Sequence, residues 1–549
     1  MIRKIILSLL AIVCVSAVKA DYTNGVFFLN EDWFGHDYGT MNFYSYDDEK
    51  MQYRVFREVN PGEHFGITSQ YVKIFGDKMY IVSKQDRTYG SDTQSGGRLV
   101  VADAKTLEKI AQVDEIGGAD GRSFVGVNAE TGYIGTTAGI YQFDLKNYTI
   151  GDVVSGSVSD VEGLYSAQIG DMIRFNGYVF AVKQSVGVLV IDVNIHEVVE
   201  TISIPEISTI FVSSMGELYA ASNSQDAEFV KIDTSDFSVE NIDLKGDGDG
   251  ISVQSTWGAW KSGSVAVDPQ ENVIYYLSSE YSTMVHKLNL STIEFTLDYI
   301  DLSSDFEGQI FYGTGISIDP NTREIALTTT ESGYGSHFEK NWLHFVNVAN
   351  PEEIRTYTLE DYYWFPAMAA YPDNEYPKIN TEPIEFVYEE GGINPYAILN
   401  LKERISDADN NIHLIQFNID VIDDEICSVE ELEYGVYKLK AKSNGRTSVV
   451  ITADSNGHVR KRELGIRTDS LTGIEKESEQ IVSVYHNPVV DELTIKGNGD
   501  VAIYTSCGYL KVALKVDGET TIDMSDYECG LYILRFNDGN RKIVERIIK

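Results

Sequence analysis

The stretch VVADAKTLEKIAQV (residues 100–113) decides the fold, because its pattern recurs five more times along the chain. An apolar strand ends in a polar residue, a short turn follows, and a second strand begins. The further copies are YQFDLKNYTIGDV (141–153), VIDVNIHEVVETI (190–202), VKIDTSDFSVENI (230–242), HKLNLSTIEFTL (286–297) and HFVNVANPEEIRTY (344–357). The shared polar position falls at Asp103, Asp144, Asp192, Asp233, Asn289 and Asn347. Such a repeat predicts a chain assembled from similar β-units.

The spacing of the repeat indicates a β-propeller. Successive shared positions are 41, 48, 41, 56 and 58 residues apart, which suits four-stranded blades of ~40 to 50 residues with loops. A seventh unit is divided between GVFFLNED (25–32) and WFPAMAAYPD (364–373). We predict that these two ends pair and close seven blades over residues 21–375, which removes open sheet edges. The shared Asp and Asn side chains are expected to accept backbone N–H bonds in their turns.

The N-terminus predicts export. Residues 1–20 combine Arg3 and Lys4 with an apolar run and the ending Val18-Lys19-Ala20, the pattern of a signal peptide. No later apolar run approaches the ~18 residues that cross a bilayer, so we predict no membrane insertion. The net charge of −40 becomes −43 when the signal, with three basic residues and no acidic one, is removed. Nucleic acid and anionic membrane surfaces are therefore poor partners.

Two smaller β-domains are predicted after the propeller. Residues 380–466 contain short alternating strands, and LKERISDADNN (401–411) with GRTSVVITADSNG (445–457) resembles the cadherin-like and immunoglobulin-like domains of bacterial surface proteins. Asp407, Asp409 and Asp454 are calcium candidates in such a domain, with turn formation as the alternative. Three cysteines, Cys427, Cys507 and Cys529, remain after removal of the signal, and Cys507 with Cys529 is a candidate pair.

Residues 476–549 carry the most specific motif. VYHNPVVDELTI (484–495), VAIYTSCGYLKVAL (501–514), TIDMSDYECGLYILRF (521–536) and KIVERIIK (542–549) resemble the type A C-terminal sorting domain of the type IX secretion system. The matching positions are Asn487-Pro488, Asp491, Leu493, Tyr504, Gly508, Gly530, Tyr532, Arg535 and Lys549, with His486 where that family usually has proline. The resemblance implies the secretion machinery as a partner, and localisation at the outer cell surface or in the medium.

Catalytic motifs are not found in the sequence. It contains no G-x-S-x-G elbow, no H-E-x-x-H, no phosphate-binding glycine loop and no haem-attachment motif. His36, His64 and His337 lie in expected loops, with no spacing that requires them to converge. Propellers that bind pyrroloquinoline quinone usually carry an adjacent-cysteine disulfide, and the propeller here contains no cysteine. We therefore predict no catalytic residues, cofactor or metal, with a polysaccharide lyase or hydrolase as the least favoured alternative.

The loops instead favour binding. In a propeller the loops between strands gather around the channel on two faces, so distant residues share one surface. Aromatic residues are concentrated there: Trp33, Phe34, Trp257, Trp260, Phe306, Phe311, Tyr312, Tyr334, Phe338, Tyr362, Tyr363, Trp364 and Phe365. Next to them, Lys84-Gln85, Lys183-Gln184, Glu280-Tyr281 and Thr330-Glu331 end inner strands. Such a surface suits a broad ligand that has apolar faces and an amide-rich rim. For any single tryptophan, the alternative is that it packs between blades.

A family resemblance makes the ligand more specific. GVFFLNEDWFGH (25–36), SQYVKIFGDKMYIVSKQ (69–85), GGRLVVADAKTLE (96–108) and GADGRSFVGV (118–127) resemble the YncE-like propellers of Gram-negative gut anaerobes. Within that group the likeness, from Asn24 to Asp373, is to surface propellers that capture cobalamin for an energy-coupled, TonB-dependent outer-membrane transporter. It implies non-enzymatic corrinoid binding, for which we predict contacts from Trp33, Phe34, His36, Lys84, Gln85, Lys183, Gln184, Glu280, Trp364 and Phe365. The alternative is an adhesin or scaffold that binds a glycan, peptide or protein.

Overall fold

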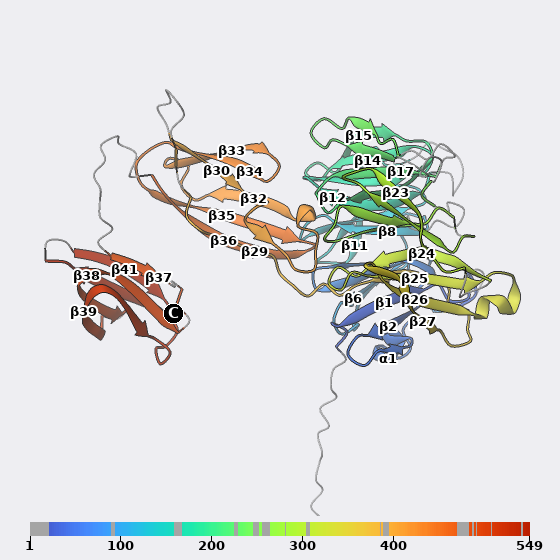
Figure 1. Ribbon diagram of the computed structural model, residues 1–549, viewed down its shortest axis with the longest axis horizontal. Helices are drawn as coiled ribbons and strands as arrows, with labels where there is room; N and C mark the ends of the chain where they lie inside the picture. The colour runs from blue at the N-terminus through green and yellow to red at the C-terminus, as the bar shows by residue number, and fades with distance from the viewer. Residues whose placement is uncertain are drawn as a thin grey trace, which may run out of the picture. The chain divides into compact units, whose positions relative to one another are not determined.

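A computed structural model (Figure 1) describes residues 21–549 except 89–93, 159–166, 224–228, 245–251, 255–263, 280, 304–307, 385, 388–394, 469–481, 486–487, 490, 507 and 540–541. The chain divides into two compact units, Met1–Ser470 and Leu471–Lys549. The first contains the repeat region and the domain that follows it. The second contains the C-terminal strands, and each unit is described separately.

The repeat region forms seven four-stranded antiparallel sheets in the described residues. From the innermost strand outward, the first sheet consists of β28 (Pro366–Ala370), β1 (Gly25–Asn30), β2 (Thr40–Ser45) and β3 (Lys50–Gln52). The second consists of β4 (Ile67–Phe75), β5 (Lys78–Gln85), β6 (Leu99–Asp103) and β7 (Lys109–Val113). The third consists of β8 (Gly121–Gly126), β9 (Thr131–Thr136), β10 (Ile140–Asp144) and β11 (Thr149–Val153). A short helix α1 (Val55–Val59) follows β3.

The other four sheets repeat the same order. The fourth sheet consists of β12 (Ile169–Phe175), β13 (Tyr178–Lys183), β14 (Gly187–Asp192) and β15 (Glu197–Ser203), and the fifth of β16 (Ile207–Val212), β17 (Leu218–Ser222), β18 (Phe229–Ile232) and β19 (Val239–Asn241). The sixth consists of β20 (Val265–Val267), β21 (Val273–Tyr276), β22 (Met284–Asn289) and β23 (Glu294–Asp301). The seventh consists of β24 (Gln309–Ile318), β25 (Glu324–Glu331), β26 (Asn341–Asn347) and β27 (Asn350–Thr358). The 3-10 helix η2 (Gly335–Glu339) lies between β25 and β26.

The sheets close into a ring, as predicted. Each innermost strand contacts the next in the cycle β4, β8, β12, β16, β20, β24, β28 and back to β4. The closure is made by β28, which comes from the end of the region and pairs antiparallel with β1, with Phe27 opposite Ala370. The predicted all-β propeller fold is therefore confirmed. Pairing the two ends of the chain leaves no innermost strand without a neighbour.

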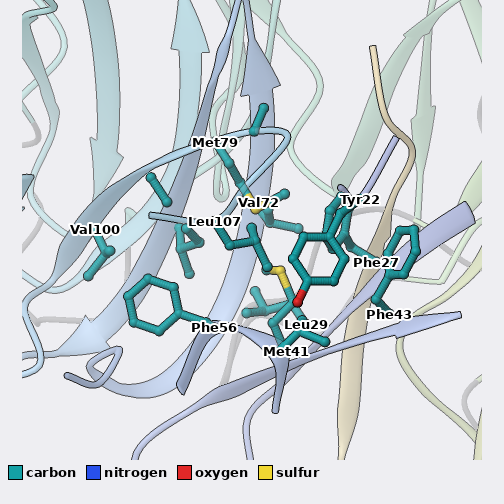
Figure 2. Close-up of a cluster of buried hydrophobic side chains, with 14 of the residues drawn as sticks. Tyr22, Phe27, Leu29, Met41, Phe43, Phe56, Val72, Met79, Val100 and Leu107 are labelled. Atoms are coloured by element: carbon teal, nitrogen blue, oxygen red, sulfur yellow. The ribbon is translucent and has the colours of Figure 1, made fainter. Parts of the chain in front are cut away.

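Apolar side chains join neighbouring sheets. Between the first two sheets, Phe27 and Phe43 from β1 and β2 pack with ring centroids 4.8 Å apart, and Val72 and Met79 from β4 and β5 complete the cluster (Figure 2). The exposed fractions of these side chains are 2 % or less. Burying a side chain of this size contributes ~1.5–3 kcal/mol. Packing of this kind holds adjacent sheets together.

The six repeated Asp and Asn residues act as predicted. Each accepts a backbone N–H from the residue two positions later: the N···O distances are 3.0 Å for Asp103, 2.8 Å for Asp144, Asp192 and Asp233, and 2.9 Å for Asn289 and Asn347. These bonds fix the turns that join the third and fourth strands of their sheets. The repeated polar position is therefore structural.

The strand order gives the propeller two different faces. Turns between first and second strands, such as Gly76-Asp77, and between third and fourth strands, such as Asp103–Thr106, lie at one end of every sheet. We call this end the turn face. Loops between second and third strands, and connections from one sheet to the next, lie at the opposite end, which we call the loop face. Antiparallel pairing requires this separation.

Residues 374–468 form a β-sandwich that packs on the turn face. Its strands are β29 (Lys378–Ile379) with β31 (Ile405–Ser406), β30 (Tyr396–Asn400) with β34 (Val436–Ala441) and β33 (Cys427–Glu433), and β32 (Gln416–Val421) with β35 (Arg446–Ser455) and β36 (His458–Arg467); η3 (Ile412–Leu414) precedes β32. Its loops meet the propeller, as Figure 1 shows for the ends of β35 and β36. Asn456 Nδ2 donates to Ile74 O at 3.0 Å, and Asn411 Nδ2 donates to Ser213 O at 3.1 Å.

The three calcium candidates serve the same contact region. Asp454 forms an ion pair with Arg174 of β12 at 2.8 Å. Asp409 accepts the backbone N–H groups of Asn374 and Glu375 at 2.8 and 3.1 Å, and Asp407 accepts those of Asp409 and Asn410. Among the described residues, no group of three or more acidic, histidine or cysteine side chains is arranged to hold a metal. Turn and interface formation account for these aspartates.

The C-terminal unit is a small β-domain. Its described strands are β37 (Val482–Tyr485), β38 (Glu492–Thr505), β39 (Leu510–Asp523), β40 (Leu531–Asn537) and β41 (Lys542–Ile548), and the long β38 pairs with β37, β39 and β40. Leu493, Ile495, Ile503 and Leu534 are fully buried in its core. Cys529 is exposed and free. Cys507, and with it the predicted pair, lies outside the described residues.

Candidate binding site on the loop face

The strand order places the nine predicted contact residues that the structure describes on the loop face. They lie at the ends of second strands or in the loops after them, as Lys84 does at the end of β5, or they precede the innermost strand β28, as Trp364 does. Glu280, Trp257 and Trp260 lie outside the described residues. In the described residues, the hydrogen bonds and ion pairs between the β-sandwich and the propeller lie on the turn face. The loop face is thus the side on which an exterior ligand can approach.

An aromatic cluster covers the loop face of the first and last sheets. The Trp33 ring stacks on the Tyr363 ring, with centroids 5.4 Å apart and 19° between the planes. Trp33 also contacts His36, with ring centroids 4.6 Å apart. Trp33 and Phe34 are 49 % and 55 % exposed. Tyr334 beside η2 is 87 % exposed and packs edge-on against Phe338. Large aromatic faces left in solvent next to one another are typical of a recognition surface.

Phe365 supports this cluster from below. Its ring contacts Tyr312, Phe338 and Phe34 at centroid distances of 4.8, 5.2 and 6.3 Å, and it is 2 % exposed. Its backbone has φ 45°, a left-handed conformation that bulky residues seldom adopt. That backbone conformation costs ~1–2 kcal/mol and is maintained by the surrounding aromatic contacts. We define the aromatic cluster as Trp33, Phe34, Tyr312, Tyr334, Phe338, Tyr363 and Phe365.

Trp364 does not contact the exterior, which corrects its predicted role. Its exposed fraction is 0 %; its indole stacks on Tyr53 at 5.3 Å, and Nε1 donates to Glu360 O at 2.7 Å. The Arg54 guanidinium lies 4.3 Å from the ring on an outer part of the sheet. Trp364 therefore packs between sheets, and Phe365 acts as a support instead of a surface contact.

A polar network continues the loop face across the first four sheets. Gln70 Nε2 donates to Glu31 Oε1 at 3.0 Å, Arg122 Nε donates to Gln168 Oε1 at 2.6 Å, and Gln168 Nε2 donates to Gln184 Oε1 at 3.1 Å. With Lys84 and Asp120, these residues form what we call the polar network. Burial lowers the pKa of Lys84, and Arg122 lowers it further, while Asp120 and Glu31 oppose the shift. Cations, carboxylates and amides thus lie together at this end of the channel.

The remaining predicted contacts differ in accessibility. Lys183 is 5 % exposed, and its Nζ donates to the carbonyl oxygens of Ser157 and Val158 at 2.9 and 3.3 Å. Lys183 therefore supports a loop and does not project outward as predicted. Gln85 is half-buried at the end of β5, and His36 is exposed beside Trp33.

The three loop histidines contact different partners. His36 packs on Trp33, His64 stacks on Tyr38 at 4.6 Å, and His337 Nδ1 is hydrogen-bonded to Glu331 Oε2 at 2.7 Å. Burial lowers the pKa of His64, with Arg57 adding to that effect. These separate roles give no arrangement in which the three histidines act on one substrate.

Several loop-face residues were not among the predicted contacts. Gln70, Arg122 and Gln168 lie on or beside innermost strands, where no local sequence pattern distinguishes a channel-mouth side chain from a packed one. Tyr312 lies in β24, Phe338 in η2 and Tyr363 in the segment before β28. All three stand in aromatic-rich stretches of sequence, which was the available signal. Their role depends on contacts between the first and last sheets, which only the closed ring brings together.

Fold and C-terminus together define an exported β-propeller protein. A secretion system C-terminal sorting domain matches residues 483–549, as the sequence motif predicted, and assigns the chain to type IX secretion, to the cell surface or the medium. Within that class, a family model described as a domain of unknown function, DUF5074, matches residues 24–372, and the chain belongs to this family. No helix in the described part of the chain has the length and apolar character to cross a membrane.

Solved structures similar to this chain include other propellers. A quinonprotein alcohol dehydrogenase-like protein of Bacteroides thetaiotaomicron is 18 % identical, with a TM-score of 0.49 over 64 % of this chain and 79 % of that one. The β-propeller domain of Cps50 (Swd1) from Myceliophteria thermophila is 8 % identical, with a TM-score of 0.38 over 58 % and 91 %. No curated protein matches the sequence.

Proposed function

We propose that this protein is a non-enzymatic surface receptor that captures cobalamin or a related corrinoid on its loop face, for delivery to an outer-membrane transporter. The observation that carries the proposal is the junction of the aromatic cluster with the polar network on the propeller face that the β-sandwich leaves uncovered. The sorting domain supports the location, since a receptor for an external nutrient must be presented outside the cell.

The aromatic cluster suits the apolar part of such a ligand. A corrin ring is broad and carries apolar edges, and Trp33, Phe34 and Tyr334 offer exposed rings of matching character. Trp33 is held by Tyr363 on one side, so its orientation is restricted before a ligand arrives. Restricted aromatic side chains lose little conformational entropy on binding, which favours affinity.

The polar network suits the periphery of the same ligand. Corrin side chains end in carboxamides, which both donate and accept hydrogen bonds. Lys84 and Gln85 are half-buried at the end of β5 in the second sheet, next to the sheet that carries Trp33, and Gln184 is half-buried after β13 in the fourth sheet. Amide and ammonium groups in that position can pair with several carboxamides at once.

Titration calorimetry of the mature chain, residues 21–549, with cyanocobalamin tests the proposal. We expect one-to-one binding and a red protein after gel filtration. Trp33→Ala should weaken binding at least ~30-fold, since truncating a central aromatic costs about 2 kcal/mol or more. The matched control is Ile195→Ala, which removes a 56 % exposed apolar side chain from the turn face and should change nothing.

Absence of heat and of retained colour with the wild-type chain would reject the corrinoid. Binding that is equally weakened by both variants would reject the loop face as its location. Retardation in gels that contain polysaccharide, without cobalamin binding, would favour the adhesin alternative, to which the exposed rings of Tyr334 and Trp33 are also suited.

A further inference from the structure

A cavity lies at the turn-face end of the central channel. Its volume is about 360 Å³, and six of the seven innermost strands or their ends contribute to its wall. The wall includes Phe75, Val125, Met172, Phe211, Val267 and Ile318, one from each of these strands or its end. An apolar wall of this kind favours an apolar part of a ligand.

The β-sandwich covers this cavity. Asn410, Asn411 and Leu414, near η3, line it together with Ser455 and Asn456 at the end of β35. The cover is fixed by direct contacts, among them the bond from Asn456 Nδ2 to Ile74 O at 3.0 Å. The cavity therefore belongs to the propeller and the sandwich together, and lies at the opposite end of the channel from the loop face.

Lys73 of β4 gives the cavity an unmatched positive charge. Its side chain lines the wall, and among the described residues its ammonium forms no hydrogen bond or ion pair. Burial lowers the pKa of Lys73, against the opposing effects of Asp373 and Asp171. Asp373 is already hydrogen-bonded to Asn410, Asn456 and His458.

The other charges that line the cavity are compensated. Asp454 pairs with Arg174 at 2.8 Å, and Asp268 pairs with Arg323 at 2.7 Å. Lys73 is thus the charged lining residue that forms no ion pair in the described structure, although the charges of Asp373 and Asp171 act on it. Lys73 is half-buried, so its ammonium has lost part of its hydration, and a bound anion would offset that cost.

We propose that this cavity is a second binding site, which holds a small amphipathic carboxylate of the medium-chain fatty acid type. The carboxylate pairs with the Lys73 ammonium, and the hydrocarbon chain lies against Phe75, Met172 and Phe211. Most of the contacts with the hydrocarbon chain come from innermost strands, and the β-sandwich shields the ligand from solvent. The site is independent of the proposed corrinoid function, because it lies at the other end of the channel.

The test uses the mature chain and sodium octanoate as the probe, with calorimetry as the measurement. We expect one-to-one binding that is weakened more than 10-fold by Lys73→Met and largely kept by Lys73→Arg. Acetate should bind more weakly than octanoate because it cannot occupy the apolar wall, and octan-1-ol should bind more weakly because it has no charge.

Two controls separate this site from other surfaces. Lys78→Met removes a lysine from the neighbouring strand β5, which does not line the cavity, and should leave octanoate binding unchanged. Trp33→Ala should also leave it unchanged, although it impairs the loop face. Absence of octanoate binding, or binding that Lys73→Met does not weaken, overturns the proposal; loss of binding in Trp33→Ala places the fatty acid on the loop face and overturns it too.

Discussion

The two faces of the propeller are built from the same repeat but differ in how their polar groups are used. On the turn face, carboxylates and amides are bonded to the backbone of their own turns or to the β-sandwich, as Asp103 and Asp454 illustrate. On the loop face, aromatic rings such as those of Trp33 and Tyr334 remain exposed. The turn face is therefore an internal interface, whereas the loop face is a surface available to a ligand.

The difference follows from the lengths of the connections. Two-residue turns such as Gly76-Asp77 carry few side chains and project little beyond the ends of the strands, so another domain can pack on them. The loop-face segments are longer, for example residues 31–39 between β1 and β2, and can carry side chains beyond the sheet. The following predictions test whether each face has the role assigned to it.

The largest effect is expected from His458→Ala on the covered face. His458 is 2 % exposed and lies 3.2 Å from Asp373. Its Nδ1 donates to Glu375 O at 2.9 Å, and its ring stacks on Tyr376 at 4.5 Å. Removing it leaves the buried Asp373 carboxylate without its charged partner, which costs about 3–5 kcal/mol. Scanning calorimetry should show that the unit containing propeller and sandwich melts at a lower temperature.

The matched control is His36→Ala, which removes an exposed histidine from the loop face and should leave that melting temperature unchanged. Equal melting temperatures for the His458 variant and the wild type would show that this contact does not stabilise the assembly of propeller and sandwich.

The same pair predicts a pH dependence. Burial alone would lower the pKa of His458, but the hydrogen bond and charge of Asp373, the Glu375 carbonyl and the charge of Asp77 together raise it to about 9. Below pH 6.5 the imidazole is charged in both folded and unfolded chains, and its full contribution is present. Between pH 6.5 and 9 only the folded state keeps the proton, so stability falls as pH rises.

The stability difference between the wild type and His458→Gln should therefore narrow by about 3 kcal/mol between pH 6 and pH 10. Urea unfolding at several pH values measures it. A difference that stays constant over that range would mean that the imidazole is neutral in the folded protein.

A smaller effect is expected in the polar network. Gln168 is fully buried and bonds both Arg122 and Gln184. Gln168→Leu should cost about 2 kcal/mol, because it leaves polar groups of both neighbours without that partner. Gln142→Leu, on the third strand of the preceding sheet, is the matched control and should be nearly neutral. The urea concentration at the midpoint of unfolding measures the stability of each variant. Equal midpoints for the two variants would show that the polar network does not stabilise the loop face.

Much of the fold is encoded locally, whereas much of the site is not. Asp103 and its five equivalents bond within their own turns, so their spacing alone predicted the blades. The closing pair of β28 and β1 followed from two incomplete units at the ends of the region. By contrast, Trp33 and Trp364 both stand in aromatic-rich loops, yet one is 49 % exposed and the other fully buried. That distinction depends on packing between distant segments.

The contacts between the propeller and the β-sandwich could not be predicted from the sequence either, because they too join distant segments. Arg174 and Asp454 are 280 residues apart and carry no local pattern that links them. The same holds for Lys73, whose environment is completed by Asn410 and Leu414 of another domain. Sequence periodicity reports the pairing of neighbouring strands, and it does not report which surfaces a later domain covers.

The smallest expected effect compares two turns on the turn face. The Asp103 carboxylate accepts from the backbone N–H groups of Lys105 and Thr106 and from the Thr106 hydroxyl, at 3.0, 2.8 and 2.9 Å. Asn347 accepts one bond, from the Ala349 N–H at 2.9 Å. Asp103→Ala should therefore cost about 1–2 kcal/mol and Asn347→Ala about 0.5–1 kcal/mol.

Urea unfolding of the two turn variants beside the wild type measures this difference. If the Asn347 variant were the less stable, the number of accepted bonds would not be what determines a turn's contribution. The rigidity of the turn face would then depend on packing against neighbouring sheets instead of on the repeated polar residue, and the sequence signal that reveals the propeller would mark its turns without stabilising them.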